Sequence, residues 1–209
     1  MNRITTPRYD KTTMALHWAT ALLVAVLWII GQTADWFPDG PFQSAYWSSH
    51  VVLGFALAVI LIWRLVWRYS GGRGLPAADA GMLHVLAKAT HYGLYLLLVS
   101  VVTLGVVNAV VRGYSIYGLF HLPQLGDRAW RRPITDWHGL AANIMLALAG
   151  VHAAAALVHQ YLWRDGLLGR MMPGADVGAG ATVPDGMIAE PQQAAVTDEP
   201  HAPRRRVGQ

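Results

Sequence analysis

The stretch WHGLAANIMLALAGVHAAAALVHQYLW, residues 137–163, decides the fold of this chain. It contains no Asp, Glu, Lys or Arg over 27 residues, and about 20 apolar residues of helix suffice to cross the hydrocarbon core of a bilayer. Water is not available there to satisfy backbone N–H and C=O groups, so such a stretch has to be helical. It nevertheless carries three histidines, His138, His152 and His159. We therefore predict a membrane-spanning helix with imidazoles inside it.

Three further apolar stretches precede it, at about residues 14–34, 49–67 and 90–111. The 209-residue chain is 54% hydrophobic and only 13% charged, whereas soluble domains carry about 25% charged residues. We predict an all-α integral membrane protein, a four-helix bundle formed by residues 1–173. Thr12 or Thr13 is the predicted N-cap of the first helix. From residue 174 to residue 209 the chain is rich in Gly, Ala, Pro and Gln, which is typical of a disordered tail.

Lysines and arginines indicate the orientation of the bundle. They occur near the N-terminus, in the second connection and after residue 163, whereas the first connection has none. The positive-inside rule therefore predicts that both termini and the tail are cytoplasmic. Four arginines of the third connection would then lie outside and require a reason beyond topology: Arg112, Arg128, Arg131 and Arg132.

The residues available for chemistry are nine histidines and no cysteine. The lack of cysteine excludes disulfides, iron–sulfur clusters and covalent c-type haem attachment. His138 and His152 are 14 residues apart, so they lie within about 40° of one helix face and roughly 21 Å apart along the axis. His50 matches the level of His138, and His17 can meet the last span on the other side of the membrane, at His152 or His159.

Two histidines from different helices at each of two levels suggest two haem b groups, each with two axial histidines. Zinc is the competing metal, although it requires three or four ligands at one depth. A channel or transporter with a histidine relay is a third interpretation, because intramembrane ionisable groups usually serve function. It predicts a colourless protein.

Several segments resemble the bacterial cytochrome b561 family. They are TTMALHW (12–18), HVVLGFALAVILIWRLVWR (50–68), WHGLAAN (137–143) and GVHAAAALVHQYLWRDGLLGRMMP (150–173). The resemblance covers about residues 8–173, and within the family it is strongest to a small di-haem member that oxidises superoxide and reduces ubiquinone. It implies a multi-pass protein of the bacterial cytoplasmic (inner) membrane.

The resemblance also implies how the histidines are used. His17 and His152 would be the axial ligands of the cytoplasmic-side haem b, and His50 and His138 those of the periplasmic-side haem b. Depth arithmetic alone favours His159 over His152 as the partner of His17, but a His159 ligand would put the two haems about 31 Å apart along the helix. We therefore follow the family and select His152. His159, with His91 as a neighbour, then becomes the expected quinone-site residue.

Two functions remain open. In the first, periplasmic superoxide gives electrons that reduce ubiquinone, and Arg112, Arg128, Arg131 and Arg132 steer the anion; their alternative role is contact with anionic lipid headgroups. In the second, the chain is the haem b membrane subunit of a redox protein partner and passes its electrons to quinone. Arg64 and Arg68 are expected to anchor the second span at the interface or to pair with a haem propionate. The expected partners are the lipid bilayer, quinone and superoxide, with no nucleic acid.

Overall fold

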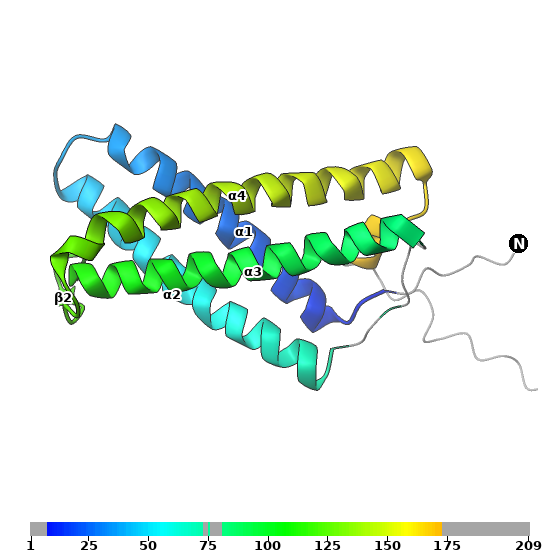
Figure 1. The fold of residues 1–209 in the computed structure, drawn as a ribbon, viewed down its shortest axis with the longest axis horizontal. Helices are drawn as coiled ribbons and strands as arrows, with labels where there is room; N and C mark the ends of the chain where they lie inside the picture. Colours follow the sequence, from blue (N-terminus) through cyan, green and yellow to red (C-terminus); the bar gives the residue numbers. More distant parts are fainter. Residues whose placement is uncertain (1–7, 73–74, 76–80, 173–209) are drawn as a thin grey trace, which may run out of the picture. The chain divides into compact units, whose positions relative to one another are not determined.

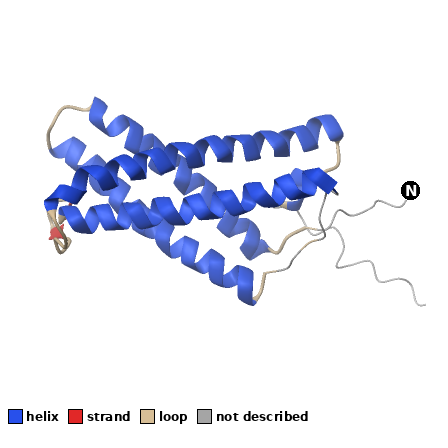
Figure 2. Cartoon of the chain, in the orientation of Figure 1, coloured by secondary structure: helices blue, strands red, loops and turns tan. Residues whose placement is uncertain are grey.

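The computed structural model describes residues 8–72, 75 and 81–172. It contains four long helices, α1 (Lys11–Thr33), α2 (Pro41–Ser70), α3 (Gly81–Arg112) and α4 (Arg131–Val158) (Figures 1 and 2). All four are long and apolar enough to cross a membrane, which confirms the predicted four-helix membrane bundle. The predicted tail, residues 174–209, lies outside the described residues.

Short elements complete the described fold. The first connection contains a 3-10 turn, η1 (Ala34–Trp36), and the third contains strands β1 (Ser115–Ile116) and β2 (Phe120–His121) and the 3-10 turn η2 (Arg128–Trp130). The strands pair antiparallel, with Ser115 opposite His121. After α4 come a π-helical turn, η3 (His159–Trp163), and then a 3-10 turn, η4 (Leu167–Arg170).

The helices are longer than the apolar stretches that predicted them. For example, α2 begins at Pro41 rather than at about Ser49, and α4 begins at Arg131 rather than at Trp137. Hydropathy marks only the part of a helix that lies in hydrocarbon, whereas backbone hydrogen bonding continues into the interface. Pro41 suits the first turn of α2 because its missing N–H would have no partner within the helix there.

The N-cap of α1 differs from the prediction, which named Thr12 or Thr13. The cap is Asp10, whose side chain accepts hydrogen bonds from the Thr13 backbone N–H at 2.8 Å and the Thr13 hydroxyl at 2.6 Å. An aspartate carboxylate caps well because it also complements the positive end of the helix dipole. The Trp67 indole N–H of α2 donates to the same carboxylate at 3.2 Å, so Asp10 ties α1 to α2.

The helices pack as two hairpins, α1 on α2 and α3 on α4, which meet chiefly through α2 and α3. The core between them consists of six buried apolar residues: Leu27, Leu57, Leu61, Leu98, Val101 and Met145. Outward-facing apolar side chains are exposed in mid-helix, including Leu22, Val59 and Leu96. This distribution suits a bundle whose outer surface is covered by lipid tails.

Two ends of the bundle can be distinguished (Figure 1). The first and third connections share one end, which we call the hairpin end, and residues 8–11 and 164–172 share the other, which we call the terminal end. At the hairpin end Ser48, only 1% exposed, accepts a hydrogen bond from the Tyr117 N–H at 3.0 Å. The Tyr117 hydroxyl lies 3.0 Å from that of Ser49. These bonds fasten the third connection to α2.

Candidate functional site

The hairpin-end pair consists of His50 on α2 and His138 on α4. Both rings are partly buried, and their centres lie 6.2 Å apart with an 81° angle between the ring planes. An imidazole nitrogen binds a first-row metal at about 2 Å, so two rings on opposite sides of one metal have centres about 6 Å apart. The separation therefore fits one metal atom shared by the two rings.

A cavity of about 570 Å³ surrounds this pair. Four glycines contribute to its wall: Gly31, Gly54, Gly105 and Gly139. A Cβ atom on Gly105 would lie 3.0 Å from Cε1 of His138, and one on Gly31 would lie 3.5 Å from Cε1 of His50. Each ring thus packs against a glycine of the neighbouring helix, and the absent side chains leave room for a large flat ligand.

Hydrogen bonding prepares this pair to bind a metal. The His138 Nδ1–H donates to the Val101 carbonyl at 3.0 Å, which leaves the Nε2 lone pair for a metal. The partly buried His50 ring faces the Leu27 backbone carbonyl of α1, although its Nδ1 atom does not reach the geometry of an ordinary hydrogen bond.

The terminal-end pair consists of His17 on α1 and His152 on α4. Their ring centres lie 6.4 Å apart with an angle of 68°, so this separation also fits a shared metal atom. Depth arithmetic had favoured His159 beside His17, but the structure places His152 there. His91 of α3 packs against His152, with ring centres 5.1 Å apart, and the Arg64 guanidinium donates to Nδ1 of His17 at 3.2 Å.

Both sites are pairs rather than clusters. Within residues 8–72, 75 and 81–172, no group of three or more His, Asp or Glu side chains could hold a metal ion by itself. Haem b needs only two axial ligands from the protein, because its porphyrin supplies the other four. Two opposed imidazoles at each end, together with the glycine-lined space around His50 and His138, therefore fit haem better than a bare ion.

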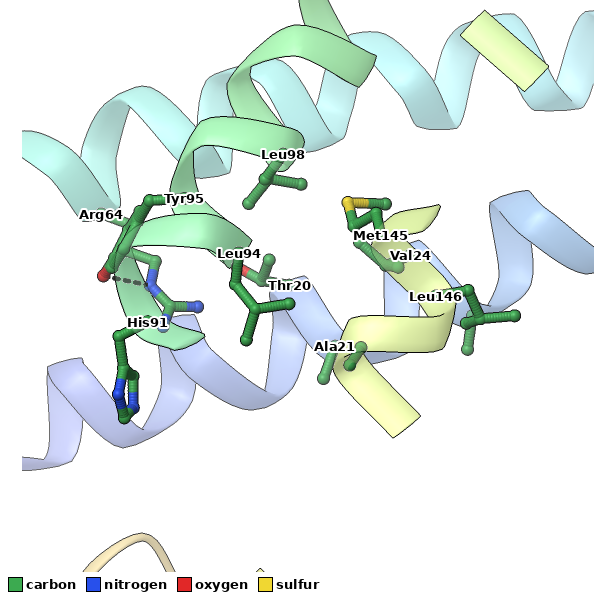
Figure 3. A pocket seen from close by; sticks show the side chains of 12 residues that line it. Thr20, Ala21, Val24, Arg64, His91, Leu94, Tyr95, Leu98, Met145 and Leu146 are labelled. Carbon is green, nitrogen blue, oxygen red and sulfur yellow. Dashed lines mark hydrogen bonds between the residues drawn. The ribbon is translucent and has the colours of Figure 1, made fainter. Parts of the chain in front are cut away.

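A second cavity, of about 160 Å³, lies beside the terminal-end pair and is shown in Figure 3. Thr20, Arg64, His91 and Tyr95 supply its polar wall, and Leu98, Met145 and Leu146 are among its apolar residues. The Arg64 Nε–H donates to the Tyr95 hydroxyl at 3.1 Å. Sequence reasoning missed Tyr95, although its position one helical turn after His91 was an available signal.

His159 occupies a different environment at the end of α4. Its side chain is buried, its Nδ1–H donates to the Asp165 carboxylate, and the Trp163 ring packs on it edge-on at 4.4 Å. Arg164, in the left-handed conformation at φ 54°, turns the chain so that Asp165 faces back. Burial raises the pKa of Asp165, but the hydrogen bonds from His159 and the Leu167 N–H and the nearby charges of His159 and Arg170 together outweigh it, so the pKa is lowered. Sequence reasoning missed Asp165.

The four arginines of the third connection take separate positions. Only Arg112 is among the residues that line the large cavity, and it donates to the Asn108 side-chain oxygen at 3.0 Å and to the Thr135 hydroxyl at 2.8 Å. Arg131 donates to the Arg112 carbonyl at 3.2 Å, whereas Arg128 and Arg132 are exposed. Tyr114 also lines this cavity; burial raises its pKa, and the nearby Arg112 opposes that shift only in part.

The fold and the paired histidines define a class of protein, the membrane-embedded helical bundles that hold haem between their helices. Residues 8–174 match the prokaryotic cytochrome b561 family, and the chain belongs to that family. It is therefore a transmembrane haem b electron-transfer protein of the bacterial inner membrane.

Curated relatives agree with this assignment. Cytochrome b561 homolog 1 of Escherichia coli is 32% identical over 79% of this chain and 97% of its own length. Cytochrome b562 of Cereibacter sphaeroides is 33% identical over 79% of this chain and 96% of its own length. A protein of Yersinia pestis named probable superoxide oxidase CybB is 30% identical over 79% of this chain and 96% of its own length.

Proposed function

We propose that the chain carries electrons across the membrane through two haem b groups, one at each histidine pair. His17 and His152 would hold the first, and His50 and His138 the second. The terminal end would face the cytoplasm and the hairpin end the periplasm, as the distribution of lysine and arginine predicts. Residues 1–173 would form the di-haem domain, and residues 174–209 a disordered cytoplasmic tail.

We further propose that the electrons come from periplasmic superoxide and go to ubiquinone. Two superoxide anions lose one electron each to give two molecules of dioxygen, and one ubiquinone takes up both electrons with two protons. Haem b, when bound, supplies the one-electron oxidation and reduction that link these half-reactions. The observation that carries the proposal is Arg112, a hydrogen-bonded cation at the wall of the cavity that contains His50 and His138.

Arg112 is suited to attract a small anion to that cavity. Its side chain is held by Asn108 and Thr135, so its charge is fixed in position, and no carboxylate of the described residues forms an ion pair with it. Arg128, Arg131 and Arg132 would add a positive field over a longer range and raise the rate of encounter.

At the terminal end, His159 and His91 are the proposed quinone-site residues. A histidine ring can hydrogen-bond a quinone carbonyl and pass a proton to it. The Asp165 carboxylate, which accepts from Nδ1 of His159, fixes the tautomer and leaves the exchange to Nε2. His91, whose ring centre lies 5.1 Å from that of His152, would be the second such residue.

The second proposal is a membrane subunit that receives electrons from a redox protein partner. Exposed apolar side chains accompany the arginines of the third connection, among them Leu119, Leu125 and Trp130. Such a mixture of apolar and basic side chains suits a docking surface for an acidic partner.

One experiment separates these functions. The purified protein is tested for haem by the pyridine haemochrome assay, then supplied with a superoxide source and a ubiquinone analogue. We expect two low-spin haems per chain, rapid reduction by superoxide and formation of ubiquinol. A protein that superoxide does not reduce, but that a co-purified redox protein does, would favour the subunit.

A further inference from the structure

Arg64 is a charged side chain inside a membrane-spanning helix, and no described residue serves as its acidic partner. It lies within α2, partly buried, at the polar side of the 160 Å³ cavity (Figure 3). Its hydrogen bonds go to the Tyr95 hydroxyl and to Nδ1 of His17, and no Asp or Glu of the described residues forms an ion pair with it. A guanidinium in such surroundings is expensive unless an anion joins it.

Metal binding at His17 takes away one of these two partners. If Nε2 of a neutral imidazole binds the metal, Nδ1 carries the proton and cannot accept a hydrogen bond from Arg64. If Nδ1 binds the metal instead, its lone pair is already used. In both cases the Arg64 N–H group that points at Nδ1 of His17 loses its acceptor, and it needs a new one close to the metal-bound ligand.

The neighbouring side chains indicate what that acceptor is. The Arg68 guanidinium, one helical turn after Arg64, also lies over the Tyr95 ring, at 5.8 Å from its centre, while that of Arg64 lies at 5.3 Å. Two cations and one phenol hydroxyl thus gather where α2 faces α3, next to the terminal-end pair. A haem b carries two propionate carboxylates on one edge, and guanidinium binds carboxylate in a bidentate manner.

We propose that Arg64 binds a propionate of the haem held by His17 and His152, that the Tyr95 hydroxyl holds Arg64 in position, and that Arg68 adds a second positive charge beside them. The cluster then sets the reduction potential of that haem, because a cation beside the propionate favours the reduced state. The inference rests on the haem-binding part of the proposed function and is independent of superoxide and of quinone.

The test compares Arg64→Gln, Arg64→Lys and Tyr95→Phe with Lys88→Gln, a control that removes one exposed charge from α3, outside the residues lining the cavity. Redox titration of the haem absorbance and the propionate bending band in resonance Raman spectra are measured on each full-length protein. For Arg64→Gln we expect one haem to shift about tenfold toward the oxidised form at a fixed potential, which is about 59 mV lower for a one-electron couple. Arg64→Lys should have a reduction potential close to that of the unmodified protein, because the charge is kept. Its propionate bending band should still be shifted, because lysine cannot bind a carboxylate in the bidentate manner of arginine.

Tyr95→Phe keeps the charge and loses only the hydroxyl that holds Arg64, so the band should shift with a smaller change of potential. This variant carries the test if Arg64→Gln loses its haem. The inference is overturned if the band is unchanged in all three variants, or if the effect of Arg64→Gln vanishes when anionic lipids are replaced by zwitterionic ones, which would identify a lipid phosphate as the acceptor. His17→Ala is the separate check: if it loses no haem, the proposed haem site itself is wrong.

Discussion

The two histidine pairs have almost the same separation, 6.2 and 6.4 Å between ring centres, yet their surroundings differ. The hairpin-end pair packs against glycines, and His138 donates to a backbone carbonyl that orients its Nε2 toward a metal. The terminal-end pair has a guanidinium on His17 and a third imidazole against His152. One site is thus arranged by backbone and the other by charged and polar side chains.

This difference bears on the direction of electron flow. At the hairpin end Arg112 and Asp35 both line the cavity, so charges of both signs are present. At the terminal end Arg64 and Arg68 lie side by side with no acidic partner among the described residues. Positive charge stabilises the reduced state of a haem, so the terminal-end site should hold the electron more tightly. Electrons delivered at the hairpin end would then move toward the terminal end.

The largest expected effect is the loss of one haem. Replacing His50 or His138 by Ala should remove the hairpin-end haem and spare the terminal-end one, because each site depends on its own pair. Replacing His17 or His152 should do the reverse. The pyridine haemochrome assay should give about one haem per chain in each variant. Redox titration should give a higher reduction potential for the haem that remains in His50→Ala than for the haem that remains in His17→Ala.

His159→Ala is the matched control, since this side chain also lies on the α4 segment but contacts Trp163 and Asp165. It should keep both low-spin haems. If His159→Ala loses a haem while His152→Ala keeps both, the ligand is His159, as depth arithmetic alone had favoured.

The next effect concerns the glycines of the hairpin-end pair. In Gly105→Ala the new Cβ would lie 3.0 Å from the His138 ring and should displace it from the Val101 carbonyl, giving partial haem loss or a high-spin fraction. Gly31→Ala, with 3.5 Å to His50, should be milder, and Gly150→Ala, where a Cβ meets no atom within 4 Å, should be silent. Equal absorption spectra in Gly105→Ala and Gly150→Ala would show that backbone packing does not position His138.

The sequence predicted these two sites unequally, for physical reasons. Span hydropathy and the spacing of His138 and His152 predicted the four helices and two levels of histidines. The choice between His152 and His159 depended on helix crossing, which depth arithmetic ignores. Asp165 was missed because it meets His159 only through a π-turn and the left-handed Arg164, and such a turn has no hydropathy signal. Asp10 was missed as the cap because two threonines followed it.

A smaller effect concerns the arginines at the hairpin end. If they steer superoxide, the second-order rate of haem reduction should fall with ionic strength, because salt screens charge over about 8–10 Å. Arg112→Gln should lower the rate several-fold, and more than Arg128→Gln or Arg132→Gln, because Arg112 alone of the four lines the cavity. Haem spectra and quinone reduction by an artificial donor should stay unchanged. A rate indifferent to salt and to Arg112 would instead favour partner docking or lipid contact.

The smallest effect is expected at Asp165, whose carboxylate accepts hydrogen bonds from His159 and the Leu167 N–H and so closes the turn after α4. Its lowered pKa means that the carboxylate stabilises the folded chain fully above the ordinary aspartate pKa of about 4, and that this contribution is lost as pH falls toward the lowered value. Because Asp165 is exposed, its contribution should be less than about 1 kcal/mol. Asp165→Asn should therefore lower Tm slightly at pH 7, and the difference from the unmodified protein should shrink in acid below pH 4. If the Tm difference for Asp165→Asn were constant from pH 7 into acid, the lost carboxylate charge would not be its cause.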